Sequence, residues 1–172
     1  MGYDTYFNGE FELDKLLSDD QREFLDMWLN GDHVARDPAL LKKADCSKRN
    51  LECLNLLDRL GMELGEECVN YVGQFNDGTT LSHDVAALPG RHCVWEISRR
   101  GATISSERGT NEDYVAWLRY IIEHFLIPWG YVLNGECYWD GDQNDDKGEI
   151  EIENNVIKVY DMVPTYVLRG GD

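Results

Sequence analysis

The sequence has no long apolar run and few basic residues, and each absence excludes a class of protein. No segment approaches the roughly 20 consecutive apolar residues of a membrane-spanning helix, so we expect no membrane insertion. The sequence has 16 Lys and Arg residues and 33 Asp and Glu residues, so its net charge is −17. This charge argues against direct nucleic-acid binding. For the one cationic stretch, residues 36–59, the sequence leaves open whether it neutralises the acidic strand within the chain or in a partner chain.

The sequence also lacks paired cysteines and the common motifs of enzymes. Its five cysteines are an odd number without a C-x-x-C pair, which indicates reduced thiols and not a secreted disulfide framework. The first residues contain neither the basic segment nor the apolar core of a secretory signal. No glycine-rich phosphate loop, G-x-S-x-G elbow or kinase motif occurs, so we assign no catalytic residue and no cofactor. A cytoplasmic, non-enzymatic protein is the interpretation we favour.

The length and composition indicate one globular domain. With 172 residues, of which 42% are hydrophobic, the chain can bury a substantial core. We expect residues 1–172 to form a single domain in which 165–172 are a flexible tail. Apolar–polar alternation predicts an N-terminal strand, a central hairpin and a C-terminal meander of strands. These elements are expected at residues 3–13, 92–106, 130–139, 148–153 and 156–161.

Three helices complete the expected fold. A capping-box pattern at 18–21 precedes a helix expected at 19–30, and leucines at helical spacing predict a second helix at 50–62. The widest apolar stripe predicts a third helix over 110–127, capped by its first four residues and ended by Pro128. Helices packed against a mostly antiparallel sheet place the protein in the α+β class.

Short sequence signals predict the details of the strands. Asn8-Gly9 predicts a bulge or a tight turn within the first strand, and Asn154-Asn155 suits a type I′ turn because Asn tolerates a positive φ. In GEIEIE, residues 148–153, the isoleucines should face the core and the glutamates the solvent. The likeness between YFNGEFEL and YVLNGECYW is too short to indicate a duplication.

Negative charge is concentrated near both ends of the chain. Residues 1–32 and 136–172 each hold seven more acidic than basic residues, and residues 138–153 alone contain seven carboxylates. We expect this charge to collect on one outward sheet surface and its loop, extended by Glu10 and Glu12 if the first strand lies nearby. The predicted partner-binding residues are Asp140, Asp142, Asp145, Asp146, Glu149, Glu151 and Glu153.

The same acidic stretch leaves a divalent-cation site open as an alternative, at loop 140–151. Its match to the EF-hand calcium template consists of Asp140, Asp142, Asn144 and Glu151. An acid, Asp145, occupies the position that requires glycine, and the flanking segments are expected strands, so an EF-hand is disfavoured. A looser cation site that uses the aspartates remains an alternative, beside a simple solvated loop.

A pocket between the helix at 110–127 and the sheet is a further alternative. It would serve a cytosolic enzyme or a small-ligand-binding protein, with His92, His124 and Tyr131 as its polar candidates. His124 falls near the apolar face of its helix and is interpreted as a core or boundary residue. The four histidines show no metal-ligand spacing.

Three stretches near the ends of the chain carry a recognisable set of motifs: MGYDTYFNGEF, PWGYVLNGECYWDGD and GEIEIENNVIKV. This set resembles a family of small uncharacterised proteins from bacteria and their phages, whereas residues 34–90 contribute little. The family has no established activity, so the resemblance implies a phage- or prophage-linked origin but no catalytic residue. Our leading hypothesis is an acidic interaction protein that binds and modulates a basic host protein, as a nucleic-acid mimic or an inhibitor of host defence.

Overall fold

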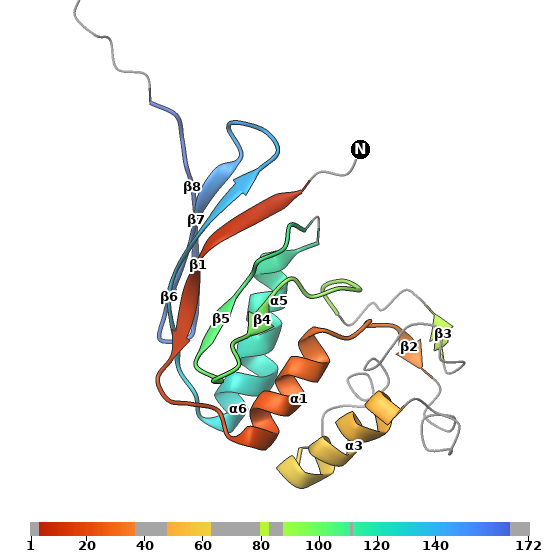
Figure 1. The fold of residues 1–172 in the computed structure, drawn as a ribbon. Helices are drawn as coiled ribbons and strands as arrows, with labels where there is room; N and C mark the ends of the chain where they lie inside the picture. Colours follow the sequence, from red (N-terminus) through yellow and green to blue (C-terminus); the bar gives the residue numbers. More distant parts are fainter. Residues whose placement is uncertain (1–3, 37–47, 63–79, 83–87, 111, 166–172) are drawn as a thin grey trace, which may run out of the picture.

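The computed structural model describes residues 4–36, 48–62, 80–82, 88–110 and 112–165. Six antiparallel strands form one sheet, and helices pack against one of its faces, which confirms the α+β class (Figure 1). The strand order is β4-β5-β1-β6-β7-β8, and β2 and β3 pair separately. The strands of the large sheet are β1 (Thr5–Leu13), β4 (Glu96–Ile97), β5 (Thr103–Ser105), β6 (Leu133–Gly141), β7 (Lys147–Glu153) and β8 (Val156–Asp161). The small sheet consists of β2 (Ala35–Arg36) and β3 (Thr80–Ser82).

The meander of β6, β7 and β8 is confirmed, and so is the central hairpin of β4 and β5, although its strands are shorter than expected. Asn154 and Asn155, with φ of 51° and 66°, form the left-handed turn between β7 and β8 that the sequence predicts. The alternation in β7 is confirmed, because Ile150 and Ile152 are buried while Glu153 is exposed. Of the expected flexible tail, 165–172, residues 166–172 lie outside the described residues.

The prediction of a bulge or turn at Asn8-Gly9 is wrong, because β1 pairs with β6 residue by residue over its whole length. Gly9 has a φ of 128° and Gly135 a φ of 139°. A Cβ on Gly9 would lie 2.5 Å from the backbone oxygen of Glu136, and one on Gly135 would lie 2.7 Å from that of Glu10. The two Asn-Gly-Glu tripeptides are offset in the antiparallel register, so that only their glutamates lie opposite each other, and each glycine allows the close approach of the other strand.

The first two helices form near the positions predicted for them. Helix α1 (Asp19–Leu29) begins with the expected capping box, in which the Ser18 hydroxyl accepts from the Gln21 amide and the Gln21 side chain accepts from the Ser18 amide. Helix α3 (Lys48–Leu60) packs against α1 and is joined to it by a 3.0 Å ion pair between Arg59 and Asp20.

The third helix begins later and ends later than predicted. It starts as α5 (Tyr114–Ile121), widens into a π-helical turn η1 (Ile122–Leu126) and closes as α6 (Ile127–Trp129). The helix therefore does not end at Pro128. Proline donates no N–H and is accommodated beside the wider turn, and Gly130 with a φ of 76° ends the helix.

The core lies between the helices and the inner face of the sheet. It is rich in aromatic rings, and the indole of Trp95 donates to the backbone oxygen of Tyr114 at 2.8 Å. The largest fully buried side chains are Trp28, Trp95, Trp117, Phe11, Phe24 and Phe125. Within the described ranges, every helix is too short or too polar to cross a bilayer.

Candidate interaction surface

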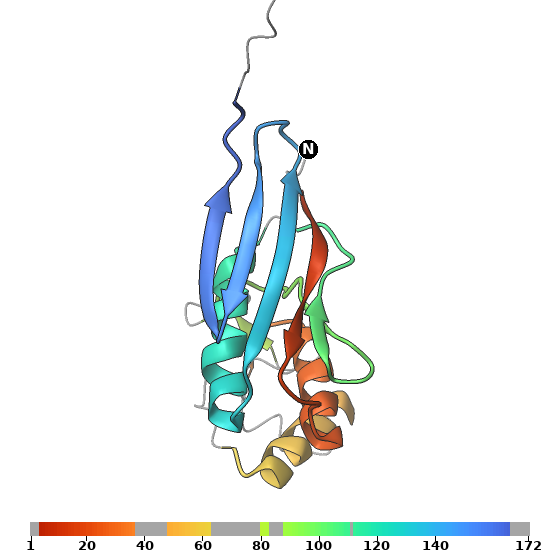
Figure 2. The ribbon, with the colours of Figure 1, turned by 90° about the vertical axis from the view of Figure 1, so that its left-hand side faces the viewer.

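The second face of the large sheet is open to solvent. Seen from this side, the four long strands run in front of the helices, and no described segment crosses them (Figure 2). We call this surface the outer face. The alternation of each strand and the register of pairing place fifteen side chains on it. They are Tyr6, Asn8, Glu10, Glu12, Asn134, Glu136, Tyr138, Asp140, Lys147, Glu149, Glu151, Glu153, Val156, Lys158 and Tyr160.

Three glutamates form a row across the middle of the outer face. Glu10 on β1 lies opposite Glu136 on β6, which lies opposite Glu151 on β7. Neighbouring strands are about 4.8 Å apart, so these like charges are nearest neighbours. Such pairs destabilise a sheet, and this row is therefore a cost to folding.

The lysines of the outer face neutralise only part of its charge. Lys147 lies 3.0 Å from Asp140, and Lys158 lies 3.0 Å from Glu153 and 3.4 Å from Glu151. The remaining acids of the face form no salt bridge with a described residue: Glu10, Glu12, Glu136 and Glu149. On the four long strands, the outer face therefore has seven carboxylates and two lysines.

Exposed tyrosines lie among these carboxylates. Tyr6, Tyr138 and Tyr160 are each about half exposed, although aromatic rings are usually buried. The carboxylates of Glu149 and Glu136 raise the pKa of Tyr138 above its ordinary value, because a phenolate beside them would be repelled. Tyr160 donates to Glu151 at 2.9 Å, and this hydrogen bond raises the pKa of Tyr160. The outer face therefore combines negative potential with aromatic rings.

The structure divides the predicted partner-binding residues between two places. Asp140, Glu149, Glu151 and Glu153 lie on the outer face, whereas Asp142, Asp145 and Asp146 lie in the β6–β7 loop at its end. Glu10 and Glu12 join the face from β1, as expected if the first strand lay nearby.

The sequence interpretation missed Glu136, although two signals pointed to it. The first is its alternation with Cys137, which is buried, and the second is the repeated Asn-Gly-Glu tripeptide.

The loop acids do not converge on one point. The carboxylate of Asp142 accepts from the backbone amide of Asp4 at 2.8 Å, and that of Asp140 is engaged by Lys147. The indole of Trp139 reaches Asp146 at 3.5 Å. Among the described residues, no three His, Cys, Asp or Glu side chains are grouped so that they could hold a metal ion.

The polar residues predicted for a helix–sheet pocket are not brought together. His92 pairs with Asp32 at 3.2 Å, and the Tyr131 hydroxyl lies 2.7 Å from Gln21. The expectation that His124 is a core or boundary residue is wrong, because it is exposed and stacks on Tyr120 at 3.8 Å. A hollow of about 150 Å³ where α5 and η1 meet β8 contains none of the three predicted residues.

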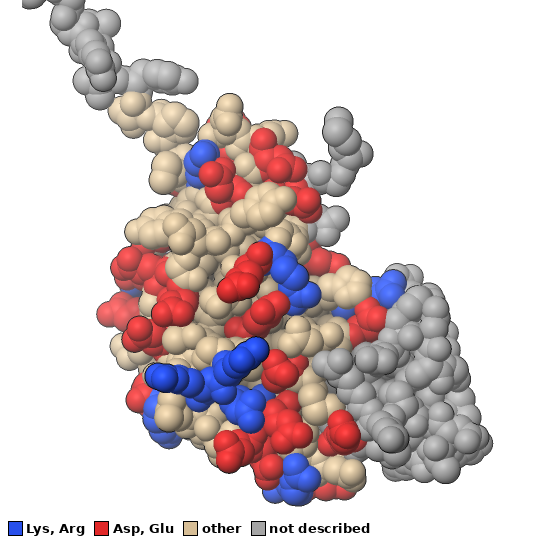
Figure 3. All heavy atoms as spheres, in the orientation of Figure 1, with Lys and Arg blue, Asp and Glu red and all other residues tan. Residues whose placement is uncertain are grey.

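Negative charge is not confined to the outer face. Figure 3 shows carboxylates over the helical side of the molecule as well, and a group of basic side chains at the turn between β4 and β5, where Arg99 and Arg100 lie. The expectation that the acids collect on one surface is therefore met only in part. Arg59, from the basic stretch at 36–59, pairs with α1 and not with the sheet, and residues 37–47 lie outside the described residues.

Comparisons of this chain with models of protein families, with curated proteins and with solved structures found no match. The resemblance of its end motifs to bacterial and phage proteins stays a prediction.

Proposed function

We propose that the protein is an interaction protein whose outer face binds a basic surface of another protein. The observation that carries this proposal is the row of Glu10, Glu136 and Glu151 on a sheet face that no described segment covers. Repulsion between these neighbouring carboxylates lowers the stability of the free protein. In a complex, cations of the partner would lie between the carboxylates and attract them.

The spacing of the carboxylates suits a surface that otherwise holds nucleic acid. Acids on neighbouring strands are about 4.8 Å apart, and acids at alternate positions along a strand are about 7 Å apart. Duplex DNA presents a similarly dense array, with one charge per ~1.7 Å of helix axis. Together with the resemblance of the end motifs to phage and bacterial proteins, this leads us to place the partner among basic host proteins, which the outer face would occupy and inhibit.

The test is capture of basic host proteins at increasing ionic strength, with two variants that lose the same charge. The triple variant E10Q/E136Q/E151Q removes the glutamate row, whereas E23Q/E52Q/D58N removes three exposed carboxylates from α1 and α3. If each ion pair between a glutamate of the row and a cation of the partner contributes ~0.5 kcal/mol, we expect the first variant to bind about tenfold more weakly. The second should bind like the unmodified protein, and binding should weaken as salt rises. Equal effects of the two variants would show that net charge, and not this face, drives capture.

A further inference from the structure

The outer face contains a hollow of about 260 Å³ at the end nearest the β6–β7 loop. Its floor is the backbone of the sheet at Phe7, Trp139 and Gly148, which occupy inner-facing positions of their strands. Its walls are outward side chains of four neighbouring segments, and we call it the tyrosine hollow. The wall residues are Tyr6, Asn8, Tyr138, Asp140, Lys147 and Met162.

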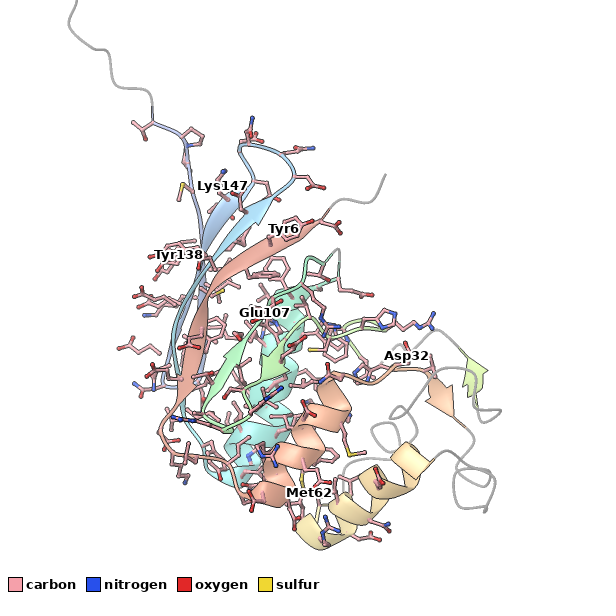
Figure 4. The ribbon with its side chains drawn as sticks, viewed as in Figure 1. Tyr6, Asp32, Met62, Glu107, Tyr138 and Lys147 are labelled. Carbon is pink, nitrogen blue, oxygen red and sulfur yellow. The ribbon has the colours of Figure 1, made fainter. Side chains whose placement is uncertain are left out.

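Three wall side chains present apolar surface that the described chain leaves exposed. Tyr6, Tyr138 and Met162 are exposed by 53%, 46% and 55%. Tyr6, Tyr138 and Lys147 lie at the same end of the sheet (Figure 4). The ring of Tyr6 leans on Gly109, where an added Cβ would lie 2.8 Å from it, so this wall is held in place. Exposed tyrosines around a hollow are typical of binding sites that anchor a partner's side chain.

The charges around the tyrosine hollow favour a cation. Asp140 lies directly opposite Tyr6 in the pairing of β1 with β6, and Glu149 lies directly opposite Tyr138 in the pairing of β6 with β7. The one cation of the wall, Lys147, is already engaged with Asp140 at 3.0 Å. The carboxylates therefore outnumber the ammonium group, and an anionic occupant would be repelled.

We propose that the tyrosine hollow takes an arginine side chain of the basic partner, a detail that rests on the proposed function. A guanidinium group is planar, so it stacks on the ring of Tyr138 while its N–H groups donate to the carboxylate of Asp140. A lysine ammonium is compact and strongly hydrated, and it gains less from an aromatic wall. The hollow would thus select arginine over lysine within a cationic surface.

The experiment titrates the full chain with acetyl-Gly-Arg-Gly-amide and follows backbone amide signals by NMR. The matched probes contain lysine or citrulline, and citrulline keeps the shape of arginine without its charge. We expect shifts at residues 6–8, 138–140 and 147–148, with the arginine peptide binding most tightly. Equal binding of the arginine and citrulline peptides would overturn the proposal.

Two variants change the hollow in opposite directions. Tyr138→Leu removes a stacking ring and should weaken arginine binding about two- to fivefold. Lys147→Met removes the competing ammonium and should strengthen it about two- to fivefold. Tyr160→Leu is the matched control, because Tyr160 is about equally exposed on the same face but lies outside the hollow. Weaker binding by Lys147→Met would show that the occupant is not a cation.

The same reagents separate this proposal from the function on which it rests. If the row variant E10Q/E136Q/E151Q loses a basic host protein while the arginine peptide causes no shifts, the outer face binds but the hollow is not its anchor. If the peptide binds in the hollow while no basic protein depends on the glutamate row, the hollow is a site for arginine and the proposed function is wrong.

Discussion

Glu10 and Glu136 lie directly opposite each other on neighbouring strands, and Glu151 continues the row on the far side of Glu136. Folding therefore places three carboxylates side by side, and of these only Glu151 has a described lysine as an ion-pair partner, Lys158 at 3.4 Å. A protein that only needed a soluble sheet could hold neutral polar residues there at lower cost, since like charges in direct cross-strand pairs are destabilising. This cost to stability supports the proposal that the row serves binding.

Replacing the central member of the row should stabilise the fold. Glu136→Gln removes two like-charge contacts, so we expect the free energy of unfolding to rise by about 0.5–1 kcal/mol in urea titrations. The gain should shrink at about 1 M salt, where the screening length is about 3 Å. Glu149→Gln is the matched control, because Glu149 lies opposite Tyr138 and Tyr160 and should change stability little. A loss of stability in Glu136→Gln would contradict this account of the row.

The glycines of the two Asn-Gly-Glu tripeptides should not tolerate a side chain. Gly135→Ala forces a φ of 139° on alanine and places a Cβ 2.7 Å from the backbone oxygen of Glu10, so β1 and β6 must separate. We expect a loss of about 2 kcal/mol or more in the free energy of unfolding. Gly130→Ala is the control, because its φ of 76° is also left-handed but the added Cβ would meet no atom within 4 Å beyond its chain neighbours and the helix backbone. Its loss should be about 1 kcal/mol, and equal losses would refute a role for the close approach.

Two buried thiols should make stability fall at alkaline pH. Burial raises the pKa of Cys93 to about 12 and that of Cys137 to about 11, from an ordinary value of 9.0. Between pH 9.0 and the raised pKa of each thiol, the unfolded chain loses thiol protons that the folded chain retains. Stability from this source is therefore complete below pH 9.0 and declines as the pH rises toward 11 and 12.

Denaturant titrations from pH 8 to pH 11 measure this decline. Lysines and tyrosines also titrate in this range, so the comparison is with Cys93→Ala and Cys137→Ala, which should each show a shallower slope. At pH 8 both thiols should also resist alkylation, as mapped by mass spectrometry, until denaturant is added. Rapid modification of either thiol in the native protein would contradict its burial.

Local sequence signals were enough for most elements of the fold but not for the order of the strands. The alternation in residues 148–153 and the Asn154-Asn155 turn depend on neighbouring residues, and both were predicted correctly. The insertion of β1 between β5 and β6 depends on contacts between residues more than 90 positions apart, for which a single sequence holds no direct signal. That insertion places Glu10 beside Glu136, so the glutamate row could not be read from the sequence.

The errors came from residues that have two roles in different contexts. Glycine after asparagine usually marks a turn, but Gly9 is needed where two strands approach closely. Thr110 is a good helix cap by type, yet its backbone amide and oxygen both pair with Thr5, which keeps it out of the helix.

The position of the true cap can be tested by substitution. The carboxylate of Asp113 accepts from the backbone amide of Ala116 at 2.9 Å, so Asp113→Ala should lower the free energy of unfolding by about 1 kcal/mol. Asp113→Asn keeps an oxygen at the cap and should retain most of that stability, because the hydrogen bond persists. Thermal unfolding followed by circular dichroism measures both changes. If Asp113→Ala and Asp113→Asn were equally harmless, the helix would not depend on this cap, and its start at Tyr114 would need another cause.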